Sequence, residues 1–559
     1  MTRITSPHIE DEAFLHPFAG MDAASCLRER AQAHPDKPFL IWAPLEGAGR
    51  AWSWRAFETD VARLAGGLLA RGVKPGERVF ILLENCPETL LMRFACAWIG
   101  AVAVLGNPAL AAPEVRDLVE ATGARAALTQ PRLYDMVAAC PGLSFVVCTQ
   151  DDAGAPPACA APASARLDAL FADPAPARAP DPLSPALILF TTGTTARAKG
   201  VVWTHANILW GAKMAATQQG VRADDVYQIF LPLFHVVGFS WSFLGAFFAG
   251  ATVVLQPRFS ASRFWPVAME HRATMASQVK FTSSVLGQSD PPAHAFRMWI
   301  TANHTPAFTQ RFGVRELTGW GMTEMVAQGI VGDPWSPQPA RSIGRPSMGY
   351  RIHVEDDDGR PVRPGETGHL FVGGVRGLSI FRDYFNDERT TAEAFDARGR
   401  FVTGDRVTLL ENGWLEFADR TKDVIKVGGE GVSGGEVEAC IMQVAGVREA
   451  AVVGAPDATW GERVVAFVIA AQGADAPEAL LAAATPVLAA GPRRELWDIL
   501  QACLEDRRSA WQMQADGTYR QLDSSDLAAD DPRALGTHAR LAEHYAQRAA
   551  ARAQASRGG

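Results

Sequence analysis

The hydrophobic positions of the N-terminal half alternate between helical and extended patterns. Val61, Leu64, Ala65, Leu68 and Leu69 recur at the spacing of one helix face. Further along, short apolar runs typical of strands alternate with helical patterns: strands at 78–83, 102–105, 126–129 and 145–148, and helices at 87–99 and 133–139. This alternation predicts parallel sheets joined by helical crossovers.

One uncharged stretch, Val236 to Leu255, is about as long as a membrane span. However, Gly250, Ala251 and Thr252 look like a break between a helix and a strand, and no basic cluster flanks the stretch. We therefore predict a buried helix, a turn and a strand over 253–255, with a membrane-inserted segment as the alternative.

Composition and charge narrow the class of protein. A chain of 559 residues with 48% hydrophobic and 20% charged residues is globular and too long for one domain. A net charge of -8 gives no general attraction to nucleic acid or to an anionic membrane surface. Its eight cysteines are scattered without metal-ligand spacing, and acidic residues interrupt the N-terminus, so we expect free thiols and a cytoplasmic protein.

The stretch from Leu187 to His205, LILFTTGTTARAKGVVWTH, has the residues of a phosphate-binding loop. An apolar strand is followed by hydroxyl donors, a glycine that permits close approach and a compact positive charge. The candidate phosphate-binding residues are Thr191, Thr192, Gly193, Thr194, Thr195 and Lys199. Because ligands bind where parallel strands end, the loop is well placed, although an ordinary threonine-rich turn has the same pattern.

Four motifs follow in order: Gly319 to Glu324 (GWGMTE), Thr403 to Asp405, Asp419 to Asp423, and Lys426 to Glu430. With these motifs the chain, from about residue 20 to about 485, resembles the adenylate-forming superfamily of acyl-CoA synthetases, luciferases and adenylation domains. Residues 342–370 and 401–441 are most similar to its crotonobetaine/carnitine-CoA ligase-like branch.

The resemblance implies an α/β fold with a large N-terminal domain and a small C-terminal one. The large domain, residues 1–419, would hold mixed and parallel sheets with flanking helices. A small α+β domain would span 420–490 and be truncated, and 491–559 would form an atypical helical tail. Residues 491–545 are similar to the C-terminal end of polyphosphate kinases but contain none of that enzyme's catalytic histidine motifs.

The resemblance also implies a reaction: ATP and Mg²⁺ activate a carboxylic acid as an acyl-adenylate, and CoA then displaces AMP. Lys199 would contact the phosphates, Thr323 the α-phosphate, and Glu324 would bind Mg²⁺ as an oxygen ligand. The resemblance makes Trp320, Asp405, Arg420 and Lys426 further cofactor-binding residues. Trp320 would stack on adenine, Asp405 would contact the ribose, and Arg420 would contact the ribose or a phosphate.

Three further positions carry roles that the resemblance implies. Lys422 would be the hinge between two orientations of the small domain, and Gly428 and Gly429 would border the channel for CoA, or form only a turn. His235 would face the carboxylate or gate the site, with a core histidine as the alternative. Aromatic residues after His235 would line the acyl pocket or belong to the core.

Two departures from the family pattern affect the expected activity. The adenine loop of many relatives is replaced by residues 301–306, TANHTP. The C-terminal lysine that bridges the carboxylate and the α-phosphate is missing, because no lysine follows Lys426. Arginine does not replace a compact ammonium group well. Losing one such charge typically costs about 100- to 1,000-fold in rate, so adenylation is expected to be impaired.

Two functions remain open. The first is a carboxylic acid–CoA ligase that takes a small acid and CoA as partners, with no nucleic acid and no membrane span. The second is a protein that binds ATP or an acyl-adenylate and has lost catalysis with the lysine. The sequence leaves a homodimer possible and does not identify the acid.

Overall fold

The structure is a computed structural model that describes residues 16–149, 165–191, 198–420, 424–427, 430–442, 444, 446–457, 461–470, 511–513 and 519–521. These residues form two compact units. The large unit contains the described residues up to 366, with 370–403 and 408–416. The small unit contains 367–369, 404–407 and the described residues from 417 onward.

A seven-stranded sheet in the large unit has the strand order β18-β8-β7-β4-β3-β5-β6. Its strands are β3 (Arg78–Leu82), β4 (Val102–Leu105), β5 (Ala126–Thr129), β6 (Phe145–Cys148), β7 (Pro185–Thr191), β8 (Lys199–Thr204) and β18 (Asp383–Tyr384). Strands β3 to β7 pair in parallel, whereas β8 is antiparallel to β7 and β18 is antiparallel to β8. The predicted parallel sheet is confirmed.

A thirteen-stranded sheet has the order β16-β17-β19-β20-β15-β14-β13-β12-β11-β9-β10-β1-β2. Its strands are β1 (Pro38–Trp42), β2 (Arg50–Ser53), β9 (Val226–Ile229), β10 (Thr252–Leu255), β11 (Met275–Ser277), β12 (Met298–Thr301), β13 (Arg315–Trp320), β14 (Ile330–Val331), β15 (Ser342–Pro346), β16 (Arg351–Glu355), β17 (Thr367–Gly373), β19 (Phe401–Leu409) and β20 (Leu415–Arg420). The run from β1 through β10, β9, β11 and β12 to β13 is parallel, and β14 and β15 continue it antiparallel.

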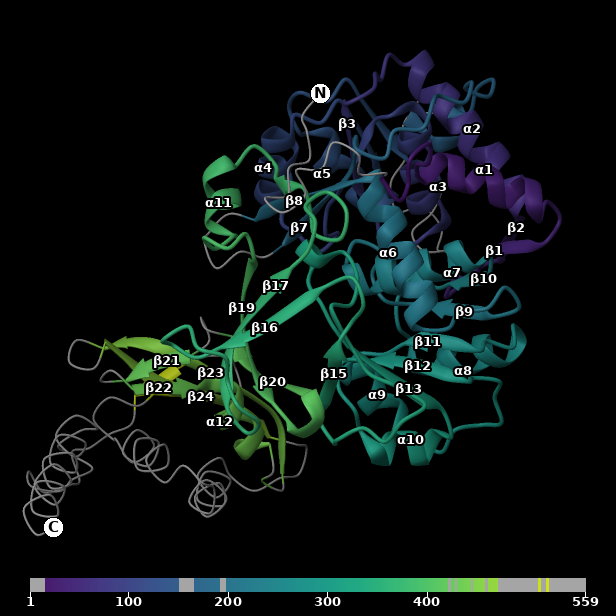
Figure 1. The fold of residues 1–559 in the computed structure, drawn as a ribbon. Coiled ribbons are helices and arrows are strands. Elements are labelled where there is room, and N and C mark those ends of the chain that lie inside the picture. The colour runs from purple at the N-terminus through teal and green to yellow at the C-terminus, as the bar shows by residue number, and fades with distance from the viewer. Residues whose placement is uncertain are drawn as a thin grey trace, which may run out of the picture. The chain divides into compact units, whose positions relative to one another are not determined.

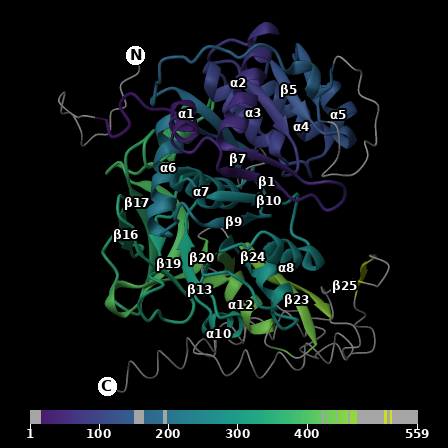
Figure 2. The same ribbon diagram turned by 90° about the vertical axis from the view of Figure 1, so that its right-hand side faces the viewer.

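Helices connect the strands of the large unit. The α-helices are α1 (Ala23–Ala33), α2 (Trp54–Ala70), α3 (Pro87–Ile99), α4 (Ala112–Thr122), α5 (Tyr134–Ala138), α6 (His205–Gln218), α7 (Gly245–Ala249), α8 (Ala261–Glu270), α9 (Lys280–Leu286), α10 (Pro306–Phe312) and α11 (Glu388–Glu393). Short 3-10 helices are η1 (Pro131–Leu133), η3 (Leu167–Leu170), η5 (Thr323–Met325) and η6 (Glu411–Gly413), and η4 (Val237–Leu244) is a π-helix. Figures 1 and 2 show these elements.

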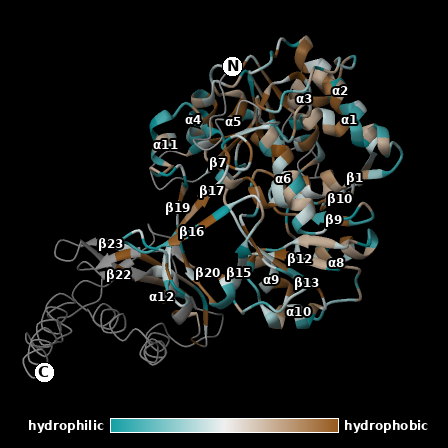
Figure 3. Ribbon diagram, in the orientation of Figure 1, coloured by the Kyte–Doolittle hydropathy of each residue, from teal (hydrophilic) through white to brown (hydrophobic). Residues whose placement is uncertain are grey.

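The hydrophobic pattern of the sequence becomes the core of the large unit. Alternate residues of β3 and β4 pack with α4 and α5 in one cluster that includes Phe80, Leu82, Val102, Val104, Val115, Val119 and Val137. Val61, Leu64, Ala65 and Leu68 of α2 are buried as predicted, whereas Leu69 in its last turn is 41% exposed. Figure 3 shows hydrophobic strands such as β12 and β19, and hydrophilic residues on α11.

The uncharged stretch 236–255 forms a helix, a turn and a strand, as predicted. The π-helix η4 runs directly into α7, Gly250 adopts a left-handed conformation, and β10 follows. Trp241, Phe243 and Phe247 are buried, and Phe243 and Phe247 pack against Phe39, so these two belong to the core. None of the helices in the described ranges has the length and apolar character needed to cross a membrane.

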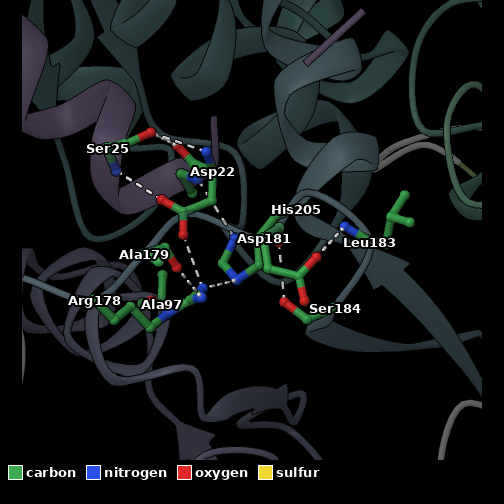
Figure 4. Close-up of polar contacts among 10 residues, drawn as sticks. Asp22, Ser25, Ala97, Arg178, Ala179, Asp181, Leu183, Ser184 and His205 are labelled. Carbon is green, nitrogen blue, oxygen red and sulfur yellow. Dashed lines mark hydrogen bonds and ion pairs between the residues drawn. The ribbon is translucent and has the colours of Figure 1, made fainter. Parts of the chain in front are cut away.

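A buried polar network joins α1, α6 and the segment that contains Arg178 in the large unit (Figure 4). Asp22 caps α1, where its Oδ1 accepts a hydrogen bond from the Ser25 N–H at 2.7 Å. Arg178 forms an ion pair with Asp22 at 2.8 Å, and the same nitrogen lies 3.2 Å from Nε2 of His205 at the start of α6. Asp22 and His205 are almost fully buried, so this network fixes α1 against α6.

The small unit contains a four-stranded sheet of order β22-β21-β24-β23. Its elements are β21 (Val424–Val427), β22 (Glu430–Ser433), α12 (Gly434–Ile441), β23 (Val447–Asp457) and β24 (Gly461–Ala470). In the segment predicted as a helical tail, the described residues form an antiparallel pair of strands, β25 (Trp511–Met513) and β26 (Tyr519–Gln521).

Candidate active site

The two ends of the predicted phosphate loop face each other across a hairpin. Strand β7 ends at Thr191 and β8 begins at Lys199, and these two residues are register partners. Because β7 is parallel to β4, Thr191 lies at the end of a parallel strand, where the sequence predicts the start of the loop. Thr192, Gly193, Thr194 and Thr195 lie outside the described residues.

Lys199, Tyr384 and Glu324 form the candidate centre of the site. Lys199 Nζ lies 5.0 Å from the centre of the Tyr384 ring, a distance that permits a cation–π interaction. The hydroxyl of Tyr384 donates a hydrogen bond of 2.8 Å to Oε1 of Glu324. Burial, and then the Glu324 carboxylate, raise the pKa of Tyr384 well above its usual value, so the phenol keeps the proton that it donates.

The two-residue strand β18 explains how Tyr384 reaches Lys199. Tyr384 is the register partner of Val201 on β8, and the Phe385 N–H donates to the Gly200 carbonyl at 2.7 Å. Tyr384 is therefore fixed by backbone pairing two residues from Lys199. Sequence reasoning missed Tyr384, because a two-residue strand has no periodic pattern.

Glu324 lies on η5, directly after β13, and only 4% of it is exposed. Its backbone carbonyl accepts a hydrogen bond from the Phe381 N–H at 2.7 Å. The indole of Trp203 on β8 donates to the carbonyl of the preceding residue, Thr323, at 2.9 Å. Segments distant in sequence thus hold the backbone of this motif, and Trp203 is a second supporting residue that the sequence does not reveal.

Gly321 lets the polypeptide pass close to its neighbours within the GWGMTE motif. A Cβ at this position would lie 2.8 Å from the Ala327 carbonyl oxygen and 3.0 Å from the Trp241 ring. Trp320, at the end of β13, is 8% exposed, so little of its ring is open to a ligand. Thr323 is half-buried.

The loop at 301–306 is held by a buried carboxylate. Glu316 on β13 is 4% exposed, and its Oε2 lies 2.7 Å from Nδ1 of His304. It also accepts hydrogen bonds from the Thr301 hydroxyl and the Thr305 N–H, each at 2.9 Å. Although this loop departs from the family pattern, it has a defined conformation at the end of β12.

His235 lies just before the π-helix η4, in contact with Phe234, at 4.5 Å between ring centres. Its side chain is exposed, although partial loss of solvent still lowers its pKa. A fully buried core histidine is therefore excluded. Its role toward a substrate remains a prediction.

The other predicted contacts fall in the small unit. Asp405 on β19 is 2% exposed, Arg420 ends β20, and Lys426 lies on β21 opposite Gly431. Lys422, Gly428 and Gly429 lie outside the described residues. The roles of these residues remain predictions.

Comparison with known proteins identifies the family. Residues 27–385 match the AMP-binding enzyme family, and 436–495 match the AMP-binding enzyme C-terminal domain. The chain is 33% identical to the crotonobetaine/carnitine–CoA ligase of Salmonella paratyphi A, over 80% of this chain and 89% of that protein.

Solved structures agree with this assignment. A Mycobacterium tuberculosis fatty acyl CoA synthetase is 27% identical, with a TM-score of 0.66 over 83% of this chain and 91% of that one. The o-succinylbenzoate CoA synthetase of Bacillus subtilis, in complex with ATP and magnesium ion, is 27% identical, with a TM-score of 0.69 over 81% and 91%. The chain therefore belongs to the AMP-binding enzyme family, as an acid–thiol ligase of the adenylate-forming superfamily.

Proposed function

We propose that this protein joins a carboxylic acid to CoA in two steps that consume ATP. In the first step, a carboxylate oxygen attacks the α-phosphorus of ATP, and the bond to pyrophosphate breaks. In the second step, the thiol sulfur of CoA attacks the acyl carbon, AMP leaves, and the thiol proton passes to solvent. The observation that carries this proposal is the arrangement of Lys199, Tyr384 and Glu324 at the end of the parallel strands.

Charge is the main obstacle in the first step, because one anion attacks another. Lys199 supplies a compact positive charge at the base of the phosphate loop, and Thr323 supplies a hydroxyl for the α-phosphate. Thr191, Thr192, Gly193, Thr194 and Thr195 complete the loop around the other phosphates. Lys199 on β8 and Thr323 on η5 are held in place before the substrate enters, so these two groups need little reorganisation during the reaction.

Glu324 fits the role of a magnesium ligand. Mg²⁺ is usually bound by one or two carboxylates together with substrate phosphates, and it prefers oxygen. Tyr384 donates to one oxygen of the Glu324 carboxylate and fixes its orientation. Bound there, Mg²⁺ would neutralise part of the phosphate charge.

The remaining contacts are assigned to the nucleotide, CoA and the acid. Trp320 is assigned to adenine, although little of its ring is exposed, Asp405 to the ribose, and Arg420 to the ribose or a phosphate. Gly428 and Gly429 are assigned to the CoA channel, and Lys426 to cofactor binding. Lys422 is assigned to the hinge, and His235 to the acid, where its exposed ring is accessible. The resemblance in motif order supports these assignments.

The missing C-terminal lysine predicts unequal half-reactions. No lysine follows Lys426, so the small unit brings no ammonium group from that region to the carboxylate and α-phosphate. We expect adenylation to be slower by about 100- to 1,000-fold than with such a lysine. Thioester formation does not need that charge. The same observation favours a second candidate, a protein that binds ATP or an acyl-adenylate without catalysis.

Two assays on the same preparation separate these candidates. Pyrophosphate release is measured over a panel of carboxylic acids with Mg²⁺ and ATP, and thioester formation is measured from supplied acyl-adenylate and CoA. A ligase with impaired adenylation gives slow pyrophosphate release and fast thioester formation. If neither product appears while calorimetry still detects Mg-ATP binding, the protein is the non-catalytic binder.

A further inference from the structure

The turn directly after Glu324 has an unusual backbone conformation. Val326 has φ 67° and ψ -49°, and the Ala327 N–H donates a hydrogen bond to the Met325 carbonyl at 2.6 Å. This is a γ-turn with positive φ, a rare and strained form. A β-branched residue is especially unfavourable there, because its Cβ crowds the backbone. Strain of this kind persists only where the surrounding structure enforces it.

Ser240, on the π-helix η4, holds this turn from one side. Its hydroxyl donates a hydrogen bond of 2.5 Å to the carbonyl of Val326. Tyr350 holds the other side, because its hydroxyl donates to the Met325 carbonyl at 2.6 Å. Ser240 and Val326 are both fully buried, so no water competes for these carbonyl groups.

Helix α6 packs closely against the turn and η4. At Gly211, in the middle of α6, a Cβ would lie 2.7 Å from the Ser240 hydroxyl and 3.1 Å from Cγ1 of Val326. The absence of a side chain at Gly211 therefore allows the three elements to meet. Single-turn π-helices often occur at functional sites, and here the wider π-helix carries the serine that reaches the turn.

We propose that Ser240 is a positioning residue for the Mg-nucleotide. It fixes the Val326 turn, and the turn fixes η5, which carries Thr323 and Glu324. Without the Ser240 hydroxyl, Val326 relaxes toward negative φ and rotates the peptide groups around Met325. Glu324, two residues before Val326, then loses its alignment with Tyr384. This inference rests on the proposed function, because it assigns Mg-ATP binding to Thr323 and Glu324.

The neighbouring Ser242 offers a matched control. It lies on the same π-helix and is equally buried. Its hydroxyl donates to the Val237 carbonyl at 2.8 Å and contacts the Ser277 hydroxyl at 2.8 Å. Ser242→Ala therefore removes a buried serine hydroxyl from η4 without removing a contact to the turn.

Calorimetry on the full chain tests the proposal. Binding of ATP is measured with Mg²⁺ and with EDTA, for the native protein, Ser240→Ala and Ser242→Ala, and circular dichroism checks the fold of each. We expect Ser240→Ala to weaken Mg-ATP binding about tenfold and ATP binding in EDTA by less, because only the former includes the contribution of Glu324. Ser242→Ala should match the native protein in both measurements.

A second variant tests the strain directly. Glycine adopts positive φ readily, so Ser240→Ala combined with Val326→Gly should recover most of the lost Mg-ATP affinity. Equal Mg-ATP affinity for the native protein and Ser240→Ala overturns the inference, as does equal loss in Ser242→Ala. If the native protein itself does not bind Mg-ATP, the proposed function fails, and this inference fails with it.

Discussion

His205 makes the stability of the large unit depend on pH in a way that can be calculated. The residue is fully buried, and burial lowers its pKa from 6.5 to about 4, with Arg178 adding to the shift and Asp22 and Asp181 opposing it. Both ring nitrogens face donors, Arg178 at 3.2 Å and the Ala23 N–H at 3.4 Å. A protonated imidazole has no acceptor to offer either of them.

The sign follows from proton linkage. Because the folded pKa lies below the unfolded value, the unfolded chain binds the extra proton between about pH 6.5 and pH 4. Stability is therefore full above about pH 6.5 and falls as the pH drops. With these two pKa values, the contribution of His205 decreases by about 2 kcal/mol between pH 7.5 and pH 5.

Scanning calorimetry at pH 5, 6 and 7.5 tests this value by comparing the native protein with His205→Gln. Glutamine keeps an acceptor for Arg178 and cannot be protonated. The variant should lose about 2 kcal/mol less than the native protein between pH 7.5 and pH 5, whatever its absolute stability. His353→Gln is the comparison: His353 is only half-buried, so its removal should change the pH dependence in the same direction as the removal of His205 but by less. An identical pH dependence for His205→Gln and the native protein would refute the reasoning.

Four other substitutions have calculable outcomes. Tyr384→Phe removes the hydrogen bond to Glu324, so the rate of pyrophosphate release should fall at least tenfold at low Mg²⁺. The rate should recover partly at high Mg²⁺, which a titration with magnesium measures. Gly211→Ala places a Cβ 2.7 Å from the Ser240 hydroxyl, so thermal unfolding should show a free energy of unfolding lower by about 1–3 kcal/mol. The comparison variant Ala212→Gly should lower the free energy of unfolding by about 1 kcal/mol. Arg93→Met should leave the melting temperature unchanged or raise it. This buried arginine has no acidic partner among the described residues, and desolvation lowers its pKa. A clear fall in the melting temperature would contradict this prediction.

Local patterns predicted most of the fold. Helix α3 spans the predicted 87–99, and β4, β5 and β6 have the predicted bounds, because apolar periodicity and flanking glycine and proline residues determine such elements locally. The pattern did not reveal the π-helix η4, the two-residue strand β18 or the turn at Val326. Each of these depends on hydrogen bonds to residues distant in sequence, such as that between Ser240 and Val326 at a separation of 86 residues.

The candidate site divides in the same way. Its charged groups, such as Lys199 and Glu324, and its hydroxyl groups, such as that of Thr323, lie in motifs that can be read from the sequence. The groups that orient them, Tyr384, Trp203 and Ser240, act largely on backbone carbonyls or through single side-chain contacts, and no motif marks them. A backbone carbonyl is the same acceptor whatever the side chain of its residue. The residue type at the accepting position therefore does not reveal these hydrogen bonds.

The location of the groups that orient η5 bears on the expected effect of the missing C-terminal lysine. The described contacts that hold Glu324 and Thr323 come from the large unit, through β8, β18 and η4. On the proposed function, the lysine missing from the small unit would remove one charge from the first step, but it would remove no described contact that holds η5. Nucleotide binding and adenylation rate should consequently be separable in this protein. If Mg-ATP affinity proves as weak as adenylation is slow, the large unit alone does not define the nucleotide site.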